Sequence, residues 1–544
     1  MKKKLSSVLL LLSAIGTTIA DHNCSCKATS QTFFTVRPQF QIGSPEYESL
    51  ARNRRTAREC GIDGAFQGVV FGGKSTNKAH LGTFFAPYCS NEIPVDGTIA
   101  INSKNVLPQN FNIFSIEFSP FISSFLSIPT LPLPAFESLV TLNPQQSVVG
   151  FGFSWQQERY LGEHWFWYGI SAPVLHVRNT MGLQEIVTNT ALYEVQPIAG
   201  ETTNLNQNLK NMTEALVQSD WNYGKIDNKI HKTTKLAFIQ LQVGMKWASN
   251  ECYYFEPFIG ATFPTGNKVK SEYVFEAIAG NGGHFGTLWG GNGGYVLWQN
   301  CNNDLQLSLE NTLVMQYLFK TREKRSFDLK YKPWSRYIEL YENQAQATQA
   351  LNLANTNLLQ SIFLSSPGIN TLTQDASVKP GFNFTNNMAI VLKGSPACNG
   401  FEAEWGYNFF ARQAECVSLK KRFGSEAAIK DSTGMGITNP VRNITADLLL
   451  NEASIANLIL TTPFNPQDIT NAYGRGIITE DDIDLSSAAH PCVMSHTIYS
   501  AFGYHWDNLC YPVFAGFGGS YEFSHTMNTG LDRWLVWGKF GISF

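Results

Sequence analysis

The chain ends in Arg533-Trp-Leu-Val-Trp-Gly-Lys-Phe-Gly-Ile-Ser-Phe544, a stretch in which apolar residues recur at every second position. Successive side chains of an extended strand point to opposite faces. One face therefore carries Trp534, Val536, Phe540, Ile542 and Phe544. The other face is mixed and carries Arg533, Leu535, Trp537, Lys539, Gly541 and Ser543. This alternation predicts a strand with one apolar and one more polar face.

The same alternation recurs in five other parts of the chain: Val149–Gln156, Ala237–Trp247, Leu305–Gln316, Phe401–Phe409 and Val513–Phe523. Most of these runs are longer than the ~5–6 residues of a usual soluble strand. They match the ~9–11 residues with which a tilted strand crosses a bilayer. A soluble β-sandwich shows the same alternation, but it explains neither the strand length nor the aromatic chain end.

With this ending and these strands, the chain resembles bacterial outer-membrane β-barrel proteins of the porin-like kind, whose last strand typically ends in Phe. The resemblance implies an all-β, transmembrane, antiparallel up-and-down barrel that the barrel-assembly machinery inserts. The candidate assembly signal is then Phe540, Ile542 and Phe544. The resemblance covers roughly residues 111–544 at the level of architecture. It identifies no subfamily, so it assigns no functional residues.

The composition of the 544 residues agrees with this interpretation. Apolar residues make up 43% and charged residues only 15%, against about 25% charged in an average soluble domain. Lys and Arg number 40 against 43 Asp and Glu, which argues against a nucleic-acid surface and against gross disorder. After residue 20 no apolar run approaches the ~20 residues of a membrane helix.

The N-terminus has the pattern of a secretory signal peptide. Lys2, Lys3 and Lys4 precede the apolar stretch Leu5–Ile15, and small residues follow up to Ala20. We expect cleavage after residue 20 and export to the outer membrane of a Gram-negative-type cell. The ten cysteines fit an oxidising compartment.

Twelve strands are predicted, an even number as bacterial barrels usually require. They lie near 111–119, 147–157, 164–177, 235–248, 252–263, 284–299, 304–320, 385–393, 400–413, 496–507, 511–525 and 532–544. Short and long links alternate, which places both barrel ends in the periplasm. A count of fourteen stays open, since Ala65–Gly72 and Arg325–Trp334 could be strands. The long outer loops are expected to contain helices near 204–218, 341–364 and 445–460.

The chain is thus divided into a signal peptide (1–20), an N-terminal periplasmic or plug segment (21–110) and the barrel (111–544). In the second part, a predicted helix from Tyr47 to Cys60 carries four arginines, Arg52, Arg54, Arg55 and Arg58. The predicted lumen is acidic on balance, and its candidate residues are Glu117, Lys246, Glu256, Glu310, Glu402, Glu404, Arg412, His505, Glu522 and Lys539. The basic helix could plug this lumen, or it could be a solvated periplasmic helix.

Four cysteines are disulfide candidates. Cys416 and Cys492 lie at the two feet of the longest outer loop, so a bridge between them would close it. Cys252 and Cys301 lie at predicted periplasmic turns and could pair with each other or with the N-terminal cysteines. No pair has C-x-x-C spacing, and we predict neither a metal nor a cofactor.

These features favour a pore or channel for small solutes. The alternatives are a structural or adhesive surface protein with a blocked lumen and, less favoured, an outer-membrane lipid-modifying enzyme. Ser524 and His525 are neighbours in one strand and therefore point to opposite faces, which argues against a catalytic pair and for a protein without enzyme activity. The expected partners are outer-membrane lipid, the barrel-assembly machinery and small solutes, with no nucleic acid. The oligomeric state stays open.

Overall fold

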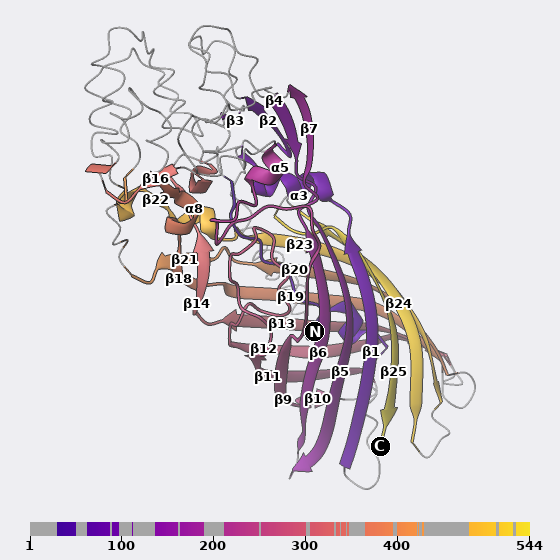
Figure 1. The fold of residues 1–544 in the computed structure, drawn as a ribbon. Helices are drawn as coiled ribbons and strands as arrows, with labels where there is room; N and C mark the ends of the chain where they lie inside the picture. Colours follow the sequence, from indigo (N-terminus) through magenta and orange to yellow (C-terminus); the bar gives the residue numbers. More distant parts are fainter. Residues whose placement is uncertain are drawn as a thin grey trace, which may run out of the picture.

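The protein is a β-barrel with a folded extension at one end (Figure 1). In this computed structural model the residues described are 30–50, 62–87, 90–96, 111–112, 137–161, 164–189, 211–249, 252–300, 305–330, 333–337, 339–343, 345–346, 365–394, 400–421, 423, 427–428, 478–506, 511–525 and 529–544. The predicted signal peptide therefore lies outside the described residues.

Among the described residues, twelve antiparallel strands pair in a closed ring. In order around the barrel they are β1 (Ile62–Ser75), β5 (Gln145–Leu161), β6 (His164–Thr180), β9 (Phe238–Met245), β11 (Tyr253–Pro264), β12 (Gly286–Gln299), β13 (Leu305–Leu318), β19 (Gly381–Gly394), β20 (Phe401–Arg412), β23 (Val493–Trp506), β24 (Val513–Ser524) and β25 (Arg533–Ser543). Two short strands, β8 (His231–Leu236) and β10 (Ala248–Ser249), pair with β6 and β11. The predicted twelve-stranded antiparallel barrel is confirmed.

The ring closes where β25 pairs with β1. In this seam Phe540 lies opposite Gly68, and a Cβ atom on Gly68 would come within 2.4 Å of the Phe540 ring. The backbone NH of Gly64 donates to the carbonyl of Phe544. The C-terminal aromatic residues of the predicted assembly signal thus pack across glycines of the first strand.

The first barrel strand differs from the prediction. It is β1, which includes the optional segment Ala65–Gly72, and not 111–119. Phe111–Asn112 instead forms β3 in a small separate sheet, and residues 113–136, with Glu117, lie outside the described residues. The boundary of the barrel at residue 111 was therefore wrong. The five glycines at positions 61, 64, 68, 72 and 73 explain the error, because they carry no side chain that could show the alternation.

The barrel has two unlike ends. The end with the C-terminus and the start of β1 carries short connections, for example between β5 and β6, and is called the turn end here. The other, the loop end, carries the extension (Figure 1). Arg325–Trp334, the other optional barrel strand, lies in this extension, where β14 (Thr321–Ser326) and β15 (Asp328–Leu329) belong to separate sheets.

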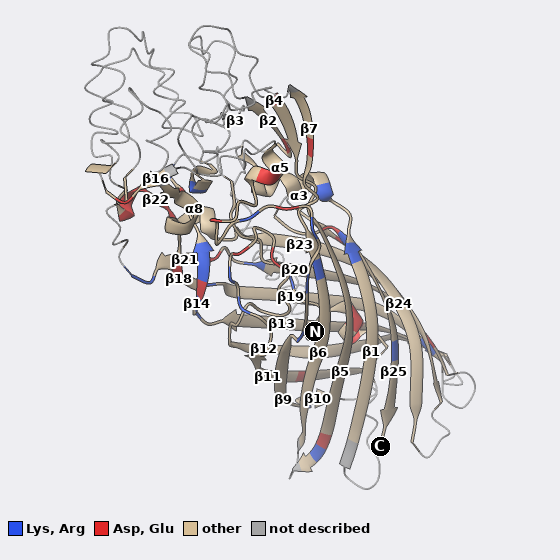
Figure 2. Cartoon of the chain, in the orientation of Figure 1, with Lys and Arg blue, Asp and Glu red and all other residues tan. Residues whose placement is uncertain are grey.

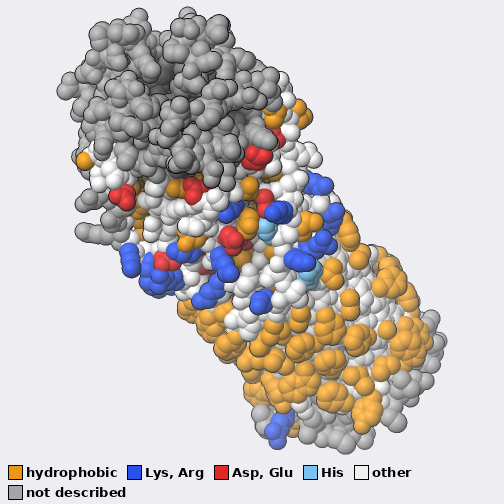
Figure 3. Space-filling model, in the orientation of Figure 1, with side chains coloured by type: hydrophobic (Ala, Val, Ile, Leu, Met, Phe, Trp, Pro, Cys, Tyr) orange, Lys and Arg blue, Asp and Glu red, His pale blue; other side chains and the backbone are white. Residues whose placement is uncertain are grey.

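An apolar band covers the lower part of the face of the barrel seen in Figure 3. Its members are exposed and alternate with buried or less exposed residues along most strands; examples are Val70, Val149, Phe151, Leu241, Ile259, Leu309, Ile390, Trp405, Phe517 and Val536. Exposure of such a large apolar surface to water would be unfavourable, whereas contact with the hydrocarbon chains of lipid would be favourable. Charged residues are sparse along the strands in Figure 2. Among the described residues, no helix is both long and apolar enough to cross a membrane.

The extension consists of small sheets and short helices around its own apolar core. One sheet contains β2 (Glu92–Asp96), β3, β4 (Glu137–Thr141) and β7 (Gln184–Asn189); another contains β14, β18 (Thr373–Lys379) and β21 (Cys416–Leu419). Two strand pairs complete it: β15 with β22 (Ile483–Asp484), and β16 (Glu339–Tyr341) with β17 (Ser365–Pro367). Its helices are α3 (Lys78–Phe85), α5 (Met212–Ala215), α8 (Gly368–Thr371), η4 (Ser335–Tyr337), η5 (Glu480–Asp482) and η6 (Leu485–Ala488). The core includes Trp221, Trp334 and Tyr337, all fully buried.

The predicted loop helices are only partly described. α5 lies inside the predicted helix 204–218 but is a single turn. Most of 341–364 and all of 445–460 lie outside the described residues. The sheets of the extension were not predicted.

The N-terminal residues 30–50 run from the extension into the barrel lumen; they are called the plug segment here. At one end Thr32 NH donates to the carbonyl of Ser487 in the extension, and at the other Leu50 NH donates to Glu404 on β20. The plug segment contains one helical turn, α2 (Pro45–Glu48), which begins at Pro45. The arginines of the predicted basic helix, Arg52 to Arg58, lie outside the described residues.

Candidate functional site: the barrel lumen

The wall of the barrel holds the plug segment with hydrogen bonds to its backbone. Lys539 Nζ donates to the carbonyl of Tyr47 at 2.8 Å and also to that of Ser49 at 2.5 Å. Asn408 Nδ2 donates to the carbonyl of Gly43 at 2.7 Å. Glu404 accepts from the NH of Leu50 at 3.0 Å. A segment that forms no sheet with the wall thereby satisfies much of its buried backbone through side chains.

Apolar contacts add to these bonds. Phe40 is fully buried and stacks on Phe71 of β1, with ring centroids 6.1 Å apart. Gly152 of β5 leaves the space that the Phe40 ring occupies, because a Cβ atom there would lie 2.5 Å from it. Phe40, Ile42, Tyr47 and Leu50 belong to one core with the inward wall residues. The lumen is therefore closed over the depth of the plug segment.

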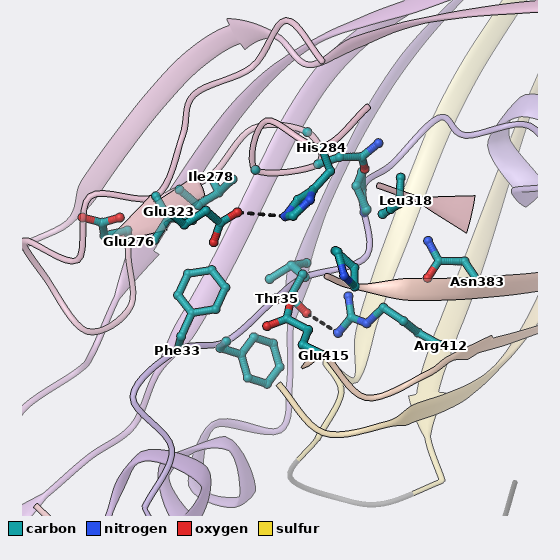
Figure 4. Close-up of a pocket in the computed structure, with 18 of the residues that line it drawn as sticks. Phe33, Thr35, Glu276, Ile278, His284, Leu318, Glu323, Asn383, Arg412 and Glu415 are labelled. Carbon is teal, nitrogen blue, oxygen red and sulfur yellow. Dashed lines mark hydrogen bonds and ion pairs between the residues drawn. The ribbon is translucent and has the colours of Figure 1, made fainter. Parts of the chain in front are cut away.

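Above this core, a small cavity lies between the plug segment and the loop end of the wall (Figure 4). Its volume is about 50 Å³, room for a few waters or one small solute. Aromatic side chains, including Phe33 and Phe410, form one part of its lining. Charged and amide side chains, including Arg412 and Asn383, form the other part.

A buried ion cluster borders this cavity. Arg325 of β14 contacts two carboxylates, Glu323 at 2.7 Å and Glu415 at 3.1 Å, and all three side chains are 1% exposed. His284 Nε2 lies 2.9 Å from Glu323; the dashed line in Figure 4 marks this contact. The Arg325 guanidinium also lies over the Phe33 ring at 3.5 Å. Buried charges in this arrangement depend on one another, since removal of one leaves its partners uncompensated.

Two titratable groups of the cluster are strongly perturbed. Burial alone would raise the pKa of Glu415, but the charges of Arg325 and Arg412, the nearby His490 and the hydrogen bond from Thr35 together outweigh burial and lower that pKa to about 2. Burial and the nearby charge of Arg412 lower the pKa of His490 to about 3. His490 Nδ1 lies 3.0 Å from Arg412 Nη2 and 2.9 Å from the carbonyl oxygen of Pro491, and a neutral ring with its proton on Nε2 could accept from the guanidinium at Nδ1. Its ring packs against Phe34, with centroids 4.9 Å apart.

Three buried polar atoms of residues that line the cavity have no hydrogen-bond partner among the described residues. They are Arg412 Nε, Asn383 Oδ1 and Asn281 Nδ2. The first and third are donors and the second is an acceptor. Buried polar groups usually have partners, so water or a small polar solute fits this cavity.

At the turn end, the lumen opens into a larger vestibule of about 280 Å³. Its charged lining consists of four glutamates and two lysines: Glu158, Glu256, Glu310, Glu402, Lys246 and Lys393. Lys246 Nζ lies 2.8 Å from Glu158, and the hydroxyl of Tyr254 donates to Glu310. The vestibule is acidic and polar, in contrast to the filled part of the lumen.

The structure places nine of the ten predicted lumen residues on the inner side of the barrel. Lys246, Glu256, Glu310 and Glu402 line the vestibule, and Arg412 lines the loop-end cavity. Glu404 and Lys539 hold the plug segment. Glu522 bonds Arg533 at 2.6 Å and Arg37 of the plug segment at 3.5 Å, and His505 is buried near the turn end. Glu117 lies outside the described residues.

The predicted Cys416–Cys492 bridge is absent, and both thiols are free. Cys416 begins β21, which pairs with β18 in the extension, whereas Cys492 directly precedes barrel strand β23. The two cysteines therefore begin segments that lead to different sheets. They do not close a single loop, as the predicted bridge assumed. Cys252 lines the vestibule, and its candidate partner Cys301 lies outside the described residues, so that pairing stays a prediction.

Sequence reasoning missed several residues of the lumen. These include Arg37, Glu46 and Glu48 of the plug segment and the extension residues Glu323, Arg325 and His490. Pro45 followed by Glu46 and Glu48 was a signal of a helix start. No local pattern marked the others, because most of their partners lie far away in the chain: Glu415 is 90 residues from Arg325, and Glu522 is 485 residues from Arg37. Among the described residues, no group of three His, Cys, Asp or Glu side chains is placed to hold a metal.

Comparisons with known proteins add weak similarities of fold. No protein-family model matches the sequence, and no curated protein matches it. Among solved structures, the COG4313 outer membrane channel from Pseudomonas putida F1 is similar at 8% identity and a TM-score of 0.35, covering 91% of this chain and 98% of that chain. A Pseudomonas aeruginosa FadL homologue is similar at 8% identity and a TM-score of 0.25, covering 89% and 90%. The transport unit of the autotransporter AIDA-I from Escherichia coli is similar at 7% identity and a TM-score of 0.22, covering 92% of this chain and 93% of that chain. The fold assignment rests on the strand pairing itself.

Proposed function

We propose that the protein is an outer-membrane channel for small solutes whose lumen is closed by the plug segment. The vestibule at the turn end admits solutes, and the loop-end cavity contacts them once the plug segment shifts. Export would follow removal of residues 1–20, with the short turns in the periplasm.

The observation that carries this proposal is the polar vestibule inside a barrel with an apolar exterior. A lumen of about 280 Å³ lined by four glutamates and two lysines is a poor packing core, but it suits the passage of polar solutes. Moreover, many wall contacts with the plug segment are isolated hydrogen bonds to its backbone, such as the two that Lys539 donates and the one that Asn408 donates. Water can replace such bonds when the segment moves.

A structural or adhesive protein with a permanently blocked lumen is the second candidate. The apolar packing of Phe40 and the folded extension favour it. Enzyme activity is not part of the proposal. The two residues considered as a catalytic pair contact other groups: Ser524 Oγ donates to the carbonyl of Met494 at 3.5 Å, and the ring centroid of His525 lies 6.1 Å from that of His496.

A liposome-swelling assay tests the channel. The variant contains a flexible Gly/Ser sequence in place of residues 30–50, and a second variant, Lys539→Met, removes two bonds to the plug segment. We expect rapid swelling with small polar solutes for the first variant and an intermediate rate for the second. Folding is checked by circular dichroism and by the shift in electrophoretic mobility on heating. A folded first variant that gives no swelling would favour the blocked-lumen protein.

A pair of lysine substitutions tests the membrane face. Leu241 is outward and exposed, whereas Gln306 lines the vestibule. Leu241→Lys should cost about 2–4 kcal/mol and impair assembly, because its charge would face lipid. Gln306→Lys should assemble normally. Equal assembly of the two variants in lipid vesicles would contradict the membrane placement.

A further inference from the structure

A row of positive side chains crosses the outer face of the barrel at its loop end. The strand register aligns Lys74 of β1 with Ser147 of β5, Ser147 with Arg178 of β6, and Arg178 with Lys232 of β8. All three cationic residues are exposed. Because neighbouring strands lie about 4.8 Å apart, Arg178 is adjacent to Lys232 and about 10 Å from Lys74. Three positive charges therefore lie within reach of one lipid headgroup.

The row lies at the edge of the apolar band. On the same strands, four residues closer to the turn end, the outward positions are Val70, Phe151 and Val174, all exposed. Four residues span about 13 Å along a strand. A lipid whose headgroup contacts the row could thus lay its acyl chains on the band.

Aromatic residues continue the row on its other side. Lys74 lies opposite Trp534 of β25, which lies opposite Tyr521 of β24. Both rings are about 40% exposed. Tyr and Trp typically mark the interface between hydrocarbon and headgroups. The row therefore lies at the depth where headgroups are expected.

Among the described residues, the cations of the row differ from those of β14 in their ion pairing. No ion pair joins Lys74, Arg178 or Lys232 to a carboxylate within the described part of the chain, whereas Arg322 and Lys324 of β14 share Asp375. Two further exposed cations lie close in sequence to the row, Lys78 three residues after β1 and Lys229 two residues before β8. Figure 3 shows basic side chains along this border of the apolar band. Such clusters at a membrane surface attract anionic lipids.

We propose that Lys74, Arg178 and Lys232 bind the phosphate groups of an anionic, multiply phosphorylated lipid in the leaflet at the loop end. This inference rests on the membrane placement in the proposed function but not on channel activity. A soluble phosphate compound would contact only the three cationic side chains. Only a phospholipid or phosphoglycolipid uses both the cations and the adjoining apolar surface.

Native mass spectrometry of the full-length protein in neutral detergent tests the proposal. The protein is titrated with bisphosphorylated lipid A, with phosphatidylcholine and with inorganic pyrophosphate. The test variant is Lys74→Gln/Arg178→Gln/Lys232→Gln, with the three single variants beside it. The control, Arg159→Gln/Lys420→Gln/Lys421→Gln, makes the same change of net charge at exposed positions elsewhere.

We expect wild type and control to prefer lipid A over phosphatidylcholine. Each single variant should weaken lipid A binding about fivefold, the triple variant by more than tenfold, and phosphatidylcholine binding should not change. Retention of full lipid A affinity by the triple variant would overturn the proposal. Pyrophosphate that binds as tightly as lipid A would also overturn it, in favour of a soluble anion. Weak binding of both lipids by the wild type would overturn the membrane placement as well.

Discussion

The two halves of the lumen use similar charged residues but differ in what covers them. At the loop end, the plug segment and the extension enclose Arg325, Glu323 and Glu415, whose side chains are 1% exposed. At the turn end, Lys246 and Glu158 form a comparable pair beside a vestibule of about 280 Å³, and Lys246 remains 20% exposed.

This contrast separates a structural from a solvated use of charge. An ion pair away from water interacts strongly, and loss of one partner is costly. A pair that water reaches is screened and contributes little. The loop-end cluster therefore fixes the extension on the barrel, whereas the vestibule charges are available to influence solutes.

The largest loss of folding stability is expected for Arg325→Met. This change leaves two buried carboxylates without their common cation and should lower the stability of the extension by about 3–5 kcal/mol. The fluorescence of Trp221 and Trp334, both buried in the extension, reports its unfolding. An unchanged unfolding transition would contradict the structural role of the cluster.

Acidification should also destabilise the loop-end half. In the folded protein the pKa of His490 is about 3, whereas a histidine in the unfolded chain has a pKa of about 6.5. Between these two pH values the unfolded state binds a proton that the folded state does not, so the free energy of unfolding falls as the pH drops from 6.5 toward 3. Glu415 adds to this below its ordinary value of 4.5, because its pKa is about 2. The loss should be on the order of a few kcal/mol.

Thermal melting of the extension at pH 7, 6, 5 and 4 measures this loss. His490→Gln removes the first titration and should flatten the pH dependence between 6.5 and 4.5. If this variant kept the wild-type slope, His490 would not be the group responsible.

A leucine substitution on the inner wall should distinguish the halves. Gly152→Leu collides with Phe40 of the plug segment and should cost about 1–3 kcal/mol through overpacking. The matched change Gln306→Leu, in the vestibule, meets open space and should be nearly neutral. Chemical denaturation of both variants measures the difference. Equal costs would mean that the vestibule is as tightly packed as the plugged half.

The smallest effect is expected for Lys246→Met. Lys246 is 20% exposed, and its partner Glu158, although buried, also lines the vestibule, so water can replace the ammonium group and we expect a loss of stability of about 1 kcal/mol or less. The same denaturation measurement applies. A loss as large as that of Arg325→Met would show that the vestibule is shielded from water.

The wall of the barrel could be predicted from the sequence, since alternation is a local signal. Leu241, Trp405 and Phe517 face outward as expected, and Phe540 packs in the closing seam. The first strand was predicted only as an optional strand, Ala65–Gly72, because glycines replace the side chains that would reveal its period. The sheets of the extension were missed because their short strands pair across long separations, as Asp328 does with Asp484.

The site was predictable only where its residues belong to alternating strands. Glu256, Glu310 and Lys539 could be assigned to the inner face by parity alone. The residues that they contact could not be predicted, because a contact such as that of Lys539 with Tyr47 joins residues far apart in the chain. For the same reason, the position of the plug segment in the lumen depended on the three-dimensional structure.

Planar-bilayer recording tests the central claim most directly. The current through the full-length protein is compared with that through the variant that carries a flexible sequence in place of residues 30–50. The proposed closure predicts a mostly silent full-length protein and a steady, voltage-independent current for the variant, with Lys539→Met between them. A steady current through the full-length protein, or silence of a correctly folded variant, would contradict the claim that this segment closes a channel.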